Sequence, residues 1–102
     1  LKAENNFITH CFKEIDANKL REIAGEIANK NNVLTFVYTQ KDQDSSLVAI
    51  AIPKNLSEKF NANNLMKEIN AKGGGKPDLT TGSIANNDLK KAIEILKNLV
   101  SE

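Results

Sequence analysis

The chain has few of the residues that carry metal, disulfide and redox chemistry. Its 102 residues include one cysteine, Cys11, one histidine, His10, and no tryptophan. A single cysteine excludes an internal disulfide framework, and one cysteine with one histidine exclude a Cys/His zinc cluster within the chain. The shortage of cysteine also fits a reducing compartment, so we expect a cytoplasmic location. Aromatic residues make up only 5%, which argues against a surface that stacks successive single-stranded bases.

Long apolar runs and a strong net charge are also missing. No apolar stretch approaches the roughly 20 residues of a membrane span, and no secretory pattern opens the chain, so we expect no membrane partner. The chain has 14 Lys and Arg against 13 Asp and Glu, a net charge of +1. Bulk charge therefore favours no class of partner. Binding to nucleic acid would require a local basic face, because a near-neutral total gives no long-range attraction to phosphate.

Three strands are predicted from runs rich in β-branched and aromatic residues, over residues 7–15, 33–39 and 47–53. The second and third runs are apolar throughout, which indicates burial on both faces. The polar link between them is short, so these two strands should be antiparallel neighbours. The first strand, the helix after it and the second strand should form a right-handed crossover with parallel strands.

Three helices are predicted where apolar residues recur at helical spacing after a residue that can cap a helix. The caps are assigned to Asp16, to Asn61 or Asn63, and to Asn86 or Asn87. The first helix should stop at residues 31–32 and the second at Gly73, and residues 73–84, which show no periodicity, should form a loop. The predicted fold class is α/β, a mixed sheet covered by helices in the order strand-helix-strand-strand-helix-loop-helix.

Residues 72–83 are the one segment that packing does not explain. Three consecutive glycines lie there between Lys72 and Lys76, and short hydroxyl side chains follow. Such glycines cost conformational entropy, and a chain keeps them where the backbone needs positive φ or where a ligand approaches closely. The backbone N–H groups of such a loop can bind an anion such as phosphate. The candidate binding residues are Lys72, Gly73, Gly74, Gly75, Lys76, Pro77, Asp78, Thr80 and Thr81.

The glycines alone leave a second interpretation open, namely a flexible connection between two helices or a tight crossing beside the sheet. The segment is not a P-loop, because the G-x-x-x-x-G-K-[ST] spacing is absent and Pro77 follows Lys76. It is not a dinucleotide-binding fingerprint either, because G-x-G-x-x-G is absent and no strand ends directly before it.

Residues 73–78, GGGKPD, resemble the GGGRPD signature near the C-terminus of alanyl-tRNA synthetases. Residues 16–21, 63–69 and 86–96 are similar to helical segments of that family, and the two apolar strands fall in the expected order. The resemblance covers most of the chain from about Phe7 onward.

The resemblance implies that residues 7–102 form the globular, tRNA-binding C-terminal domain of an alanyl-tRNA synthetase, related to the domain attached to DHH phosphoesterases. Residues 1–6 would be the end of a preceding helical segment or a tail, and the chain, which begins with Leu1, would be part of a longer protein. In that family this domain contacts the body of alanine-specific tRNA and assists aminoacylation and editing. The sites for ATP, magnesium and zinc lie in other domains, so neither a catalytic residue nor a metal or cofactor site is expected here. The other expected partners are those domains and, in a homodimer, a second copy of the chain.

The sequence departs from that family at Lys76, where arginine is usual, so the charge is kept but bidentate phosphate geometry is lost. A related phosphoesterase subfamily has histidine at this position, and the catalytic Asp-His-His motif of that superfamily is absent. A substrate-binding domain of a DHH-type phosphoesterase is therefore the alternative function. A dimerisation module is the other alternative.

The remaining candidates have structural explanations. His10 and Cys11 are adjacent on a predicted strand and should point to opposite faces, which disfavours a nucleophile–base pair. Asp42 and Asp44 are expected in a solvated turn, because the spacing of a calcium loop is absent.

Residues 54–78 contain five lysines and three acidic residues, a net charge of +2. If RNA binds there, we expect recognition of phosphate and shape. Those lysines are Lys54, Lys59, Lys67, Lys72 and Lys76.

Overall fold

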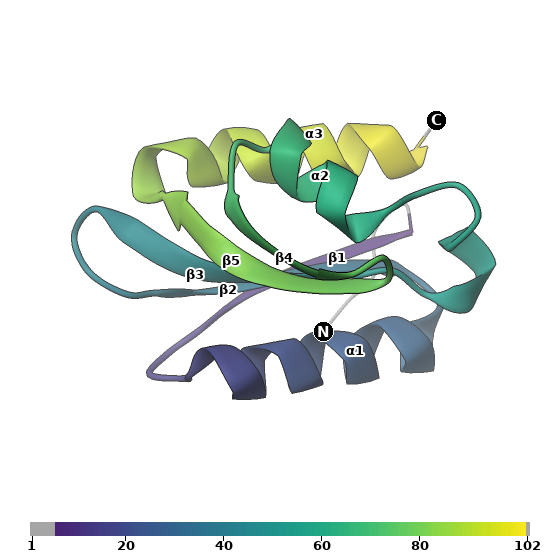
Figure 1. Cartoon of the computed structure of the whole chain (residues 1–102), viewed down its shortest axis with the longest axis horizontal. Helices are drawn as coiled ribbons and strands as arrows, with labels where there is room; N and C mark the ends of the chain where they lie inside the picture. Colours follow the sequence, from purple (N-terminus) through teal and green to yellow (C-terminus); the bar gives the residue numbers. More distant parts are fainter. Residues whose placement is uncertain (1–5, 102) are drawn as a thin grey trace.

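A five-stranded sheet forms the middle layer of the computed structural model, which describes residues 6–101 (Figure 1). The elements in chain order are β1 Phe7–Phe12, α1 Ala17–Asn31, β2 Leu34–Gln40, β3 Ser45–Ala51, α2 Ala62–Glu68, β4 Lys72–Lys76, β5 Leu79–Ala85 and α3 Leu89–Ser101. Short 3₁₀ turns at Lys54–Leu56 and Asn86–Asp88 precede α2 and α3. The predicted α/β class with a mixed sheet is confirmed. The expected lead-in at residues 1–6 lies outside the described residues except for Asn6.

The strand order is β1-β2-β3-β5-β4, so β1 and β4 are the two edge strands. β1 and β2 are parallel, as predicted for a strand–helix–strand unit, and all other neighbours are antiparallel. Helix α1 covers one face of the sheet, and α2 and α3 cover the other (Figure 1). Within residues 6–101, no helix combines the length and apolarity needed to cross a membrane.

Side chains of the central strands alternate between two cores, as the strand period of two requires. Phe36 and Ile50 are buried in the larger core beneath α2 and α3. Val37 and Ala49 are buried in the smaller core beneath α1, with Leu20 of that helix. Both faces of β2 and β3 are therefore covered, which confirms the interpretation of their continuous apolar runs.

Two of the predicted helix caps are confirmed. The Asp16 carboxylate accepts the backbone N–H of Lys19 at 2.7 Å, and Asn32, in the left-handed conformation, ends α1. The Asn61 side chain accepts the backbone N–H of Asn63 at 2.9 Å at the start of α2. Short polar side chains at these positions satisfy N–H groups that have no partner within a helix.

The predicted cap of the third helix is wrong. α3 begins at Leu89, after the 3₁₀ turn, and the Asn86 side chain binds the β2–β3 hairpin instead. Its carbonyl oxygen accepts the Ser46 hydroxyl, and its amide donates to the backbone oxygen of Asp42 at 3.0 Å. A contact between residues 40 or more positions apart could not be predicted from local sequence.

The predicted loop over residues 73–84 is also wrong. Helix α2 ends at Glu68, well before Gly73, because Asn70 adopts a left-handed conformation with φ of 63°. Asparagine tolerates that conformation better than most residues. The chain then forms strands β4 and β5, so the order is β-α-β-β-α-β-β-α. The first strand is shorter than predicted as well, since it stops at Phe12 and Glu14 has a φ of 49°.

Candidate functional site

The glycine-rich segment is the outer half of an antiparallel hairpin. In β4, Lys72 is paired with Ser83 of β5, and Lys76 is paired with Leu79. The two residues between Lys76 and Leu79 form the turn, so the hairpin has the tightest common connection. Strand β4 has no strand partner on its other side and is exposed along its whole length. The three glycines are thus strand residues on an edge, and not a flexible connection.

Close approach of the two backbones explains why several of these positions hold glycine. Gly73 and Gly82 are paired across the hairpin. A Cβ atom on Gly73 would overlap the carbonyl oxygen of Thr81, and one on Gly82 would overlap the carbonyl oxygen of Lys72. Gly73 also has a φ of 151°, which other residues rarely adopt. At these positions the group that approaches closely is the backbone of the neighbouring strand.

Asn63 of α2 closes part of the free edge. Its side-chain amide donates to the Gly75 carbonyl at 3.2 Å, and its side-chain oxygen accepts the Gly75 N–H at 3.1 Å. The two bonds reproduce the pattern that a further strand would make with Gly75. Asn63 therefore satisfies backbone groups that would otherwise be unpaired on an exposed strand.

The hairpin turn is anchored through its backbone carbonyl groups. The Pro77 carbonyl accepts the N–H of Ala62 at 2.6 Å, and the Asp78 carbonyl accepts the N–H of Ile52 at 2.8 Å. An aspartate in a turn commonly accepts backbone N–H groups through its carboxylate. Here the main-chain oxygen of Asp78 makes the bond instead, and the carboxylate has no hydrogen bond within the described residues.

The register places the two lysines of β4 on one face. Leu79 packs into the core beneath α1, so its partner Lys76 lies on the α1 side of the sheet. Lys72 is four residues away and shares this face, since side chains alternate along a strand. Thr81 belongs to the same face and is partly buried. Thr80 lies on the opposite face, fully buried with an unpartnered hydroxyl, so it cannot reach a ligand at the surface.

The sequence did not reveal a third cationic side chain. Arg21 of α1 lines a recess of about 400 Å³ together with Gly74, Gly75, Lys76 and Leu79. More than 50 residues separate Arg21 from the hairpin, so only the fold brings it there. Within residues 6–101, neither Arg21 nor Lys76 takes part in an ion pair.

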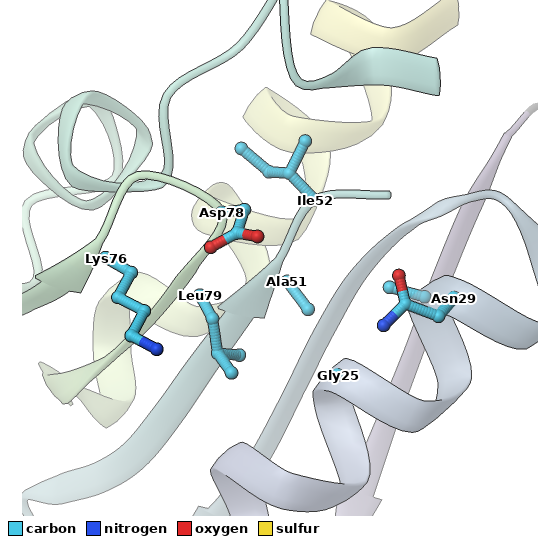
Figure 2. A pocket seen from close by; sticks show the side chains of 8 residues that line it. Gly25, Asn29, Ala51, Ile52, Lys76, Asp78 and Leu79 are labelled. Carbon is cyan, nitrogen blue, oxygen red and sulfur yellow. The ribbon is translucent and has the colours of Figure 1, made fainter. Parts of the chain in front are cut away.

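A second recess adjoins the first, since both include Lys76 and Leu79. It has a volume of about 140 Å³ and lies between α1 and the end of the hairpin (Figure 2). Figure 2 shows Asn29 on one side of this recess and Lys76 on the other, with Leu79 and Ala51 between them. The other residues that line it are Gly25, Ala28, Ile52 and Asp78. The two recesses together are called the α1–hairpin groove below.

The His10–Cys11 pair does not form a nucleophile–base arrangement. The His10 ring contacts Phe12 edge to face, with 4.6 Å between ring centroids, and Cys11 projects to the other face of β1. Burial raises the pKa of the neighbouring Tyr38, with a smaller contribution from Cys11, so the phenol stays protonated at neutral pH. The structural interpretation of these residues is confirmed.

Asp42 organises the tip of the β2–β3 hairpin. Its carboxylate accepts the backbone N–H of Asp44 at 2.9 Å and that of Ser45 at 2.8 Å. The bond from Asp44, followed by that from Ser45, holds the pKa of Asp42 below its usual value. The predicted turn is therefore confirmed. The described residues bring together no group of three or more His, Cys, Asp or Glu side chains that could hold a metal ion.

Comparison with curated proteins finds relatives among alanine--tRNA ligases. The chain is 29% identical over 92 residues to the enzyme of Francisella philomiragia, which covers 85% of this chain. It is 28% identical over 97 residues to the enzyme of Wolbachia pipientis, which covers 94% of this chain. In both cases the alignment spans only 11% of the relative. The chain thus corresponds to a small part of these enzymes.

Two solved structures share the fold. The C-Ala domain of Aquifex aeolicus alanyl-tRNA synthetase superposes with a TM-score of 0.84 and 24% identity, covering 94% of this chain and 91% of that one. A pGpG-specific phosphodiesterase from Vibrio cholerae superposes with a TM-score of 0.63 and 19% identity, covering 97% of this chain and 34% of that one. The family model described as the DHHA1 domain matches residues 4–102. The family relationship that the GGGKPD signature indicated is therefore confirmed. The chain belongs to the DHHA1 domain family.

Proposed function

We propose that the chain is the C-terminal tRNA-binding domain of a cytoplasmic alanine--tRNA ligase and that it contacts the tRNA body through the α1 side of β4. The observation that carries this proposal is the shared face of Lys72 and Lys76. Both side chains are exposed, and neither makes an ion pair within residues 6–101. The similarity to alanine--tRNA ligases over most of the chain supports this choice of RNA.

The spacing of the two lysines suits a sugar–phosphate backbone. Four residues of an extended strand span roughly 13 Å, so the two ammonium groups can engage phosphates separated along one RNA strand. Lysine ammonium groups act as point charges without a fixed hydrogen-bond geometry. We therefore expect weak, salt-dependent recognition of phosphate and shape, without base stacking. ATP, magnesium and zinc would serve the other domains of the parent enzyme, which would also be partners of this one.

Binding of alanine tRNA to the chain at low salt tests the proposal. We expect the Lys72→Ala, Lys76→Ala double variant to weaken binding, because each lost phosphate contact lowers the slope of log K against log salt by about 0.7–0.9. A Lys90→Ala, Lys91→Ala double variant is the matched control. It removes the same charge from exposed positions on α3, across the sheet. Equal affinities and salt slopes for the two double variants would show that the site is wrong.

The similarity to a pGpG-specific phosphodiesterase supports a second candidate function, the substrate-binding domain of a DHH-type phosphoesterase. In that case the same cationic face would hold a phosphate of a short nucleotide. The coding sequence of the whole protein separates the two candidates, because an Asp-His-His motif belongs to the phosphoesterase and a synthetase core to the ligase. A homodimer stays a prediction, and light scattering on the chain would test it.

A further inference from the structure

The two edge strands of the sheet differ in how their edges are protected. In β4, lysines flank the glycines, and Asn63 binds both main-chain groups of Gly75. Lysine side chains and covered main-chain groups are common means of preventing a further strand from pairing with an edge. The other edge strand, β1, has the sequence FITHCF and contains no lysine, proline or glycine. The edge of β1 therefore lacks these protections.

The pairing of β1 with β2 determines which main-chain groups of β1 point away from the sheet. The Leu34 N–H donates to the Asn6 carbonyl at 3.0 Å, and Leu34 lies opposite Phe7. In a parallel pair, a residue bonds to the neighbours of the residue opposite it, so Asn6 and every second residue after it bond to β2. The N–H and C=O groups of Phe7, Thr9 and Cys11 therefore point outward. In the part of the chain that the structure describes, no other strand pairs with them.

Thr9, in the middle of this outward row, also has an unpaired side chain. Its hydroxyl is buried and has no hydrogen-bond partner among the described residues. Buried hydroxyl groups in folded proteins are normally hydrogen-bonded, and leaving one unpaired costs free energy. The unpaired hydroxyl belongs to the same residue as the central outward N–H and C=O groups. Main chain and side chain thus lack a partner at the same place.

The helices leave the edge of β1 accessible. Helix α1 packs over β2 and β3, and α3 is the helix that contacts β1 from the opposite face of the sheet (Figure 1). The side chains of His10 and Cys11 are exposed, and those of Thr9 and Phe12 are partly exposed. A further strand can therefore approach along β1 without displacing an element of the described fold.

We propose that the β1 edges of two copies of this chain pair in antiparallel orientation and form a homodimer with one continuous sheet. A twofold axis brings the same surface of each copy together. The register that uses most of the outward groups places Thr9 opposite Thr9 of the second copy, and Phe7 opposite Cys11. In such hydrogen-bonded pairs the two residues exchange both N–H···O bonds, so every outward group of both edges finds a partner.

The side chains of β1 favour a second copy over another extended segment. Any strand would satisfy the outward main-chain groups, but in the twofold pair the two Thr9 hydroxyls lie opposite one another. A hydroxyl both donates and accepts, and hydrogen bonds between opposed threonines stabilise antiparallel pairs. Residues 7–12 contain no Lys, Arg, Asp or Glu, so self-pairing brings no like charges together. The interface excludes the hairpin lysines, so it does not depend on binding of tRNA.

The proposed dimer should be weak. A pair of six-residue strands alone buries less than the roughly 1,200 Å² of a stable interface. We therefore expect a dissociation constant on the order of 10⁻⁴ M. Sedimentation equilibrium of the chain from about 10 μM to about 1 mM measures it, since this range brackets that value. A chain that remains monomeric throughout this range would overturn the proposal.

Substitutions at Thr9 test the edge itself. Thr9→Val removes the hydroxyl at nearly constant volume and should weaken the dimer on the order of fivefold. Thr80→Val is the matched control, because it removes the other buried, unpartnered threonine hydroxyl, from an inner strand; it should leave the dimer unchanged. Thr9→Pro removes an N–H that β2 does not use and should abolish the dimer. If proline disrupts folding, Thr9→Val still tests the interface. Equal effects of Thr9→Val and Thr80→Val would refute the role of the edge.

Oxidative cross-linking tests the register. In the proposed pair, the two Thr9 Cα atoms lie about 5.5 Å apart, within the range that a disulfide spans. The two Cys11 residues lie more than about 13 Å apart, because each is opposite Phe7. Under mild oxidation we expect a covalent dimer from Thr9→Cys combined with Cys11→Ser, and none from the parent. Cross-linking of the parent through Cys11, or none of the variant, would contradict this register.

The lysine variants separate this proposal from the proposed function. Lys72→Ala with Lys76→Ala should leave the dimer unchanged, because β4 is the opposite edge of the sheet. Thr9→Val should in turn leave the affinity of the monomer for alanine tRNA unchanged at about 1 μM protein, far below the expected dissociation constant. A dimer that responds to the lysines and not to Thr9 would show that the wrong edge had been assigned. Loss of tRNA binding alone leaves the β1 interface intact.

Discussion

Replacing Gly82 by alanine tests the close approach of β4 and β5. A Cβ on Gly82 would overlap the carbonyl oxygen of Lys72 and lie 2.9 Å from its carbonyl carbon. It would also lie 3.1 Å from Cα of Gly73. All three are backbone atoms, so no side-chain rotation can relieve the overlap. The two strands must therefore separate at this point.

The expected loss of stability follows from that separation. Overpacking costs about 1–3 kcal/mol, and weakening one neighbouring ladder hydrogen bond adds about 1 kcal/mol. We therefore expect Gly82→Ala to lower the free energy of unfolding by about 2–4 kcal/mol, from a total of about 5–15 for a domain of this size. With a urea m-value of about 2 kcal/mol/M, the midpoint should fall by about 1–2 M.

Gly74→Ala is the matched control, because it adds the same methyl group to the paired strand. Its Cβ meets only a side-chain atom, the Asn63 oxygen at 3.4 Å. Restricting the unfolded chain offsets part of any cost, so the free energy of unfolding of Gly74→Ala should stay within about 1 kcal/mol of the parent value. Circular dichroism during urea unfolding measures both variants. If Gly82→Ala is as stable as Gly74→Ala, the two strands do not approach as described and the account of the glycines fails.

Three further changes test other contacts of the hairpins. Asn86→Ala should cost about 1–3 kcal/mol in urea unfolding, because the buried Ser46 hydroxyl loses its partner; an unchanged midpoint would contradict this contact. Asn63→Ala exposes both backbone groups of Gly75, so we expect lower stability and concentration-dependent association in light scattering; a variant as stable and as monomeric as the parent would rule out the edge-closing role. The folded-state pKa of Asp42 is lowered, so its stabilisation is present above the unfolded pKa and is lost as the pH falls through the folded pKa. The difference in midpoint between the parent and Asp42→Asn should therefore shrink as the pH is lowered below about 4, whereas a difference independent of pH would argue against this linkage.

Local sequence patterns predicted the helices and central strands because their signals are local. Asp16 and Asn61 cap helices through bonds to N–H groups two or three residues away. The runs around Phe36 and Ile50 are apolar because two layers of helices cover the sheet. Each of these features depends on few neighbours, so composition and spacing suffice to predict it.

The hairpin was missed because glycine is a poor strand former and masks the alternating pattern of β4. The turn at residues 77–78 joins proline and aspartate, which favour turns, and β-branched threonines follow it in β5. Those signals were present, yet only the pairing with β3 makes a strand of residues 79–85. The role of Arg21 had no local signal, because the groove is formed by segments that meet only in the folded chain.

The structure changes which glycines bear on ligand binding. The run 73–75 first indicated a backbone open to phosphate, yet Gly73 and Gly75 are required by β5, and Asn63 occupies the N–H of Gly75. The hairpin therefore does not present consecutive backbone N–H groups that could form an anion site. Gly25 and Gly74, where a Cβ atom would make only ordinary contacts, line the smaller and the larger recess on separate elements. The case for binding phosphate thus rests on the cationic side chains of Lys72 and Lys76, and on Arg21, which only the fold brings to the hairpin.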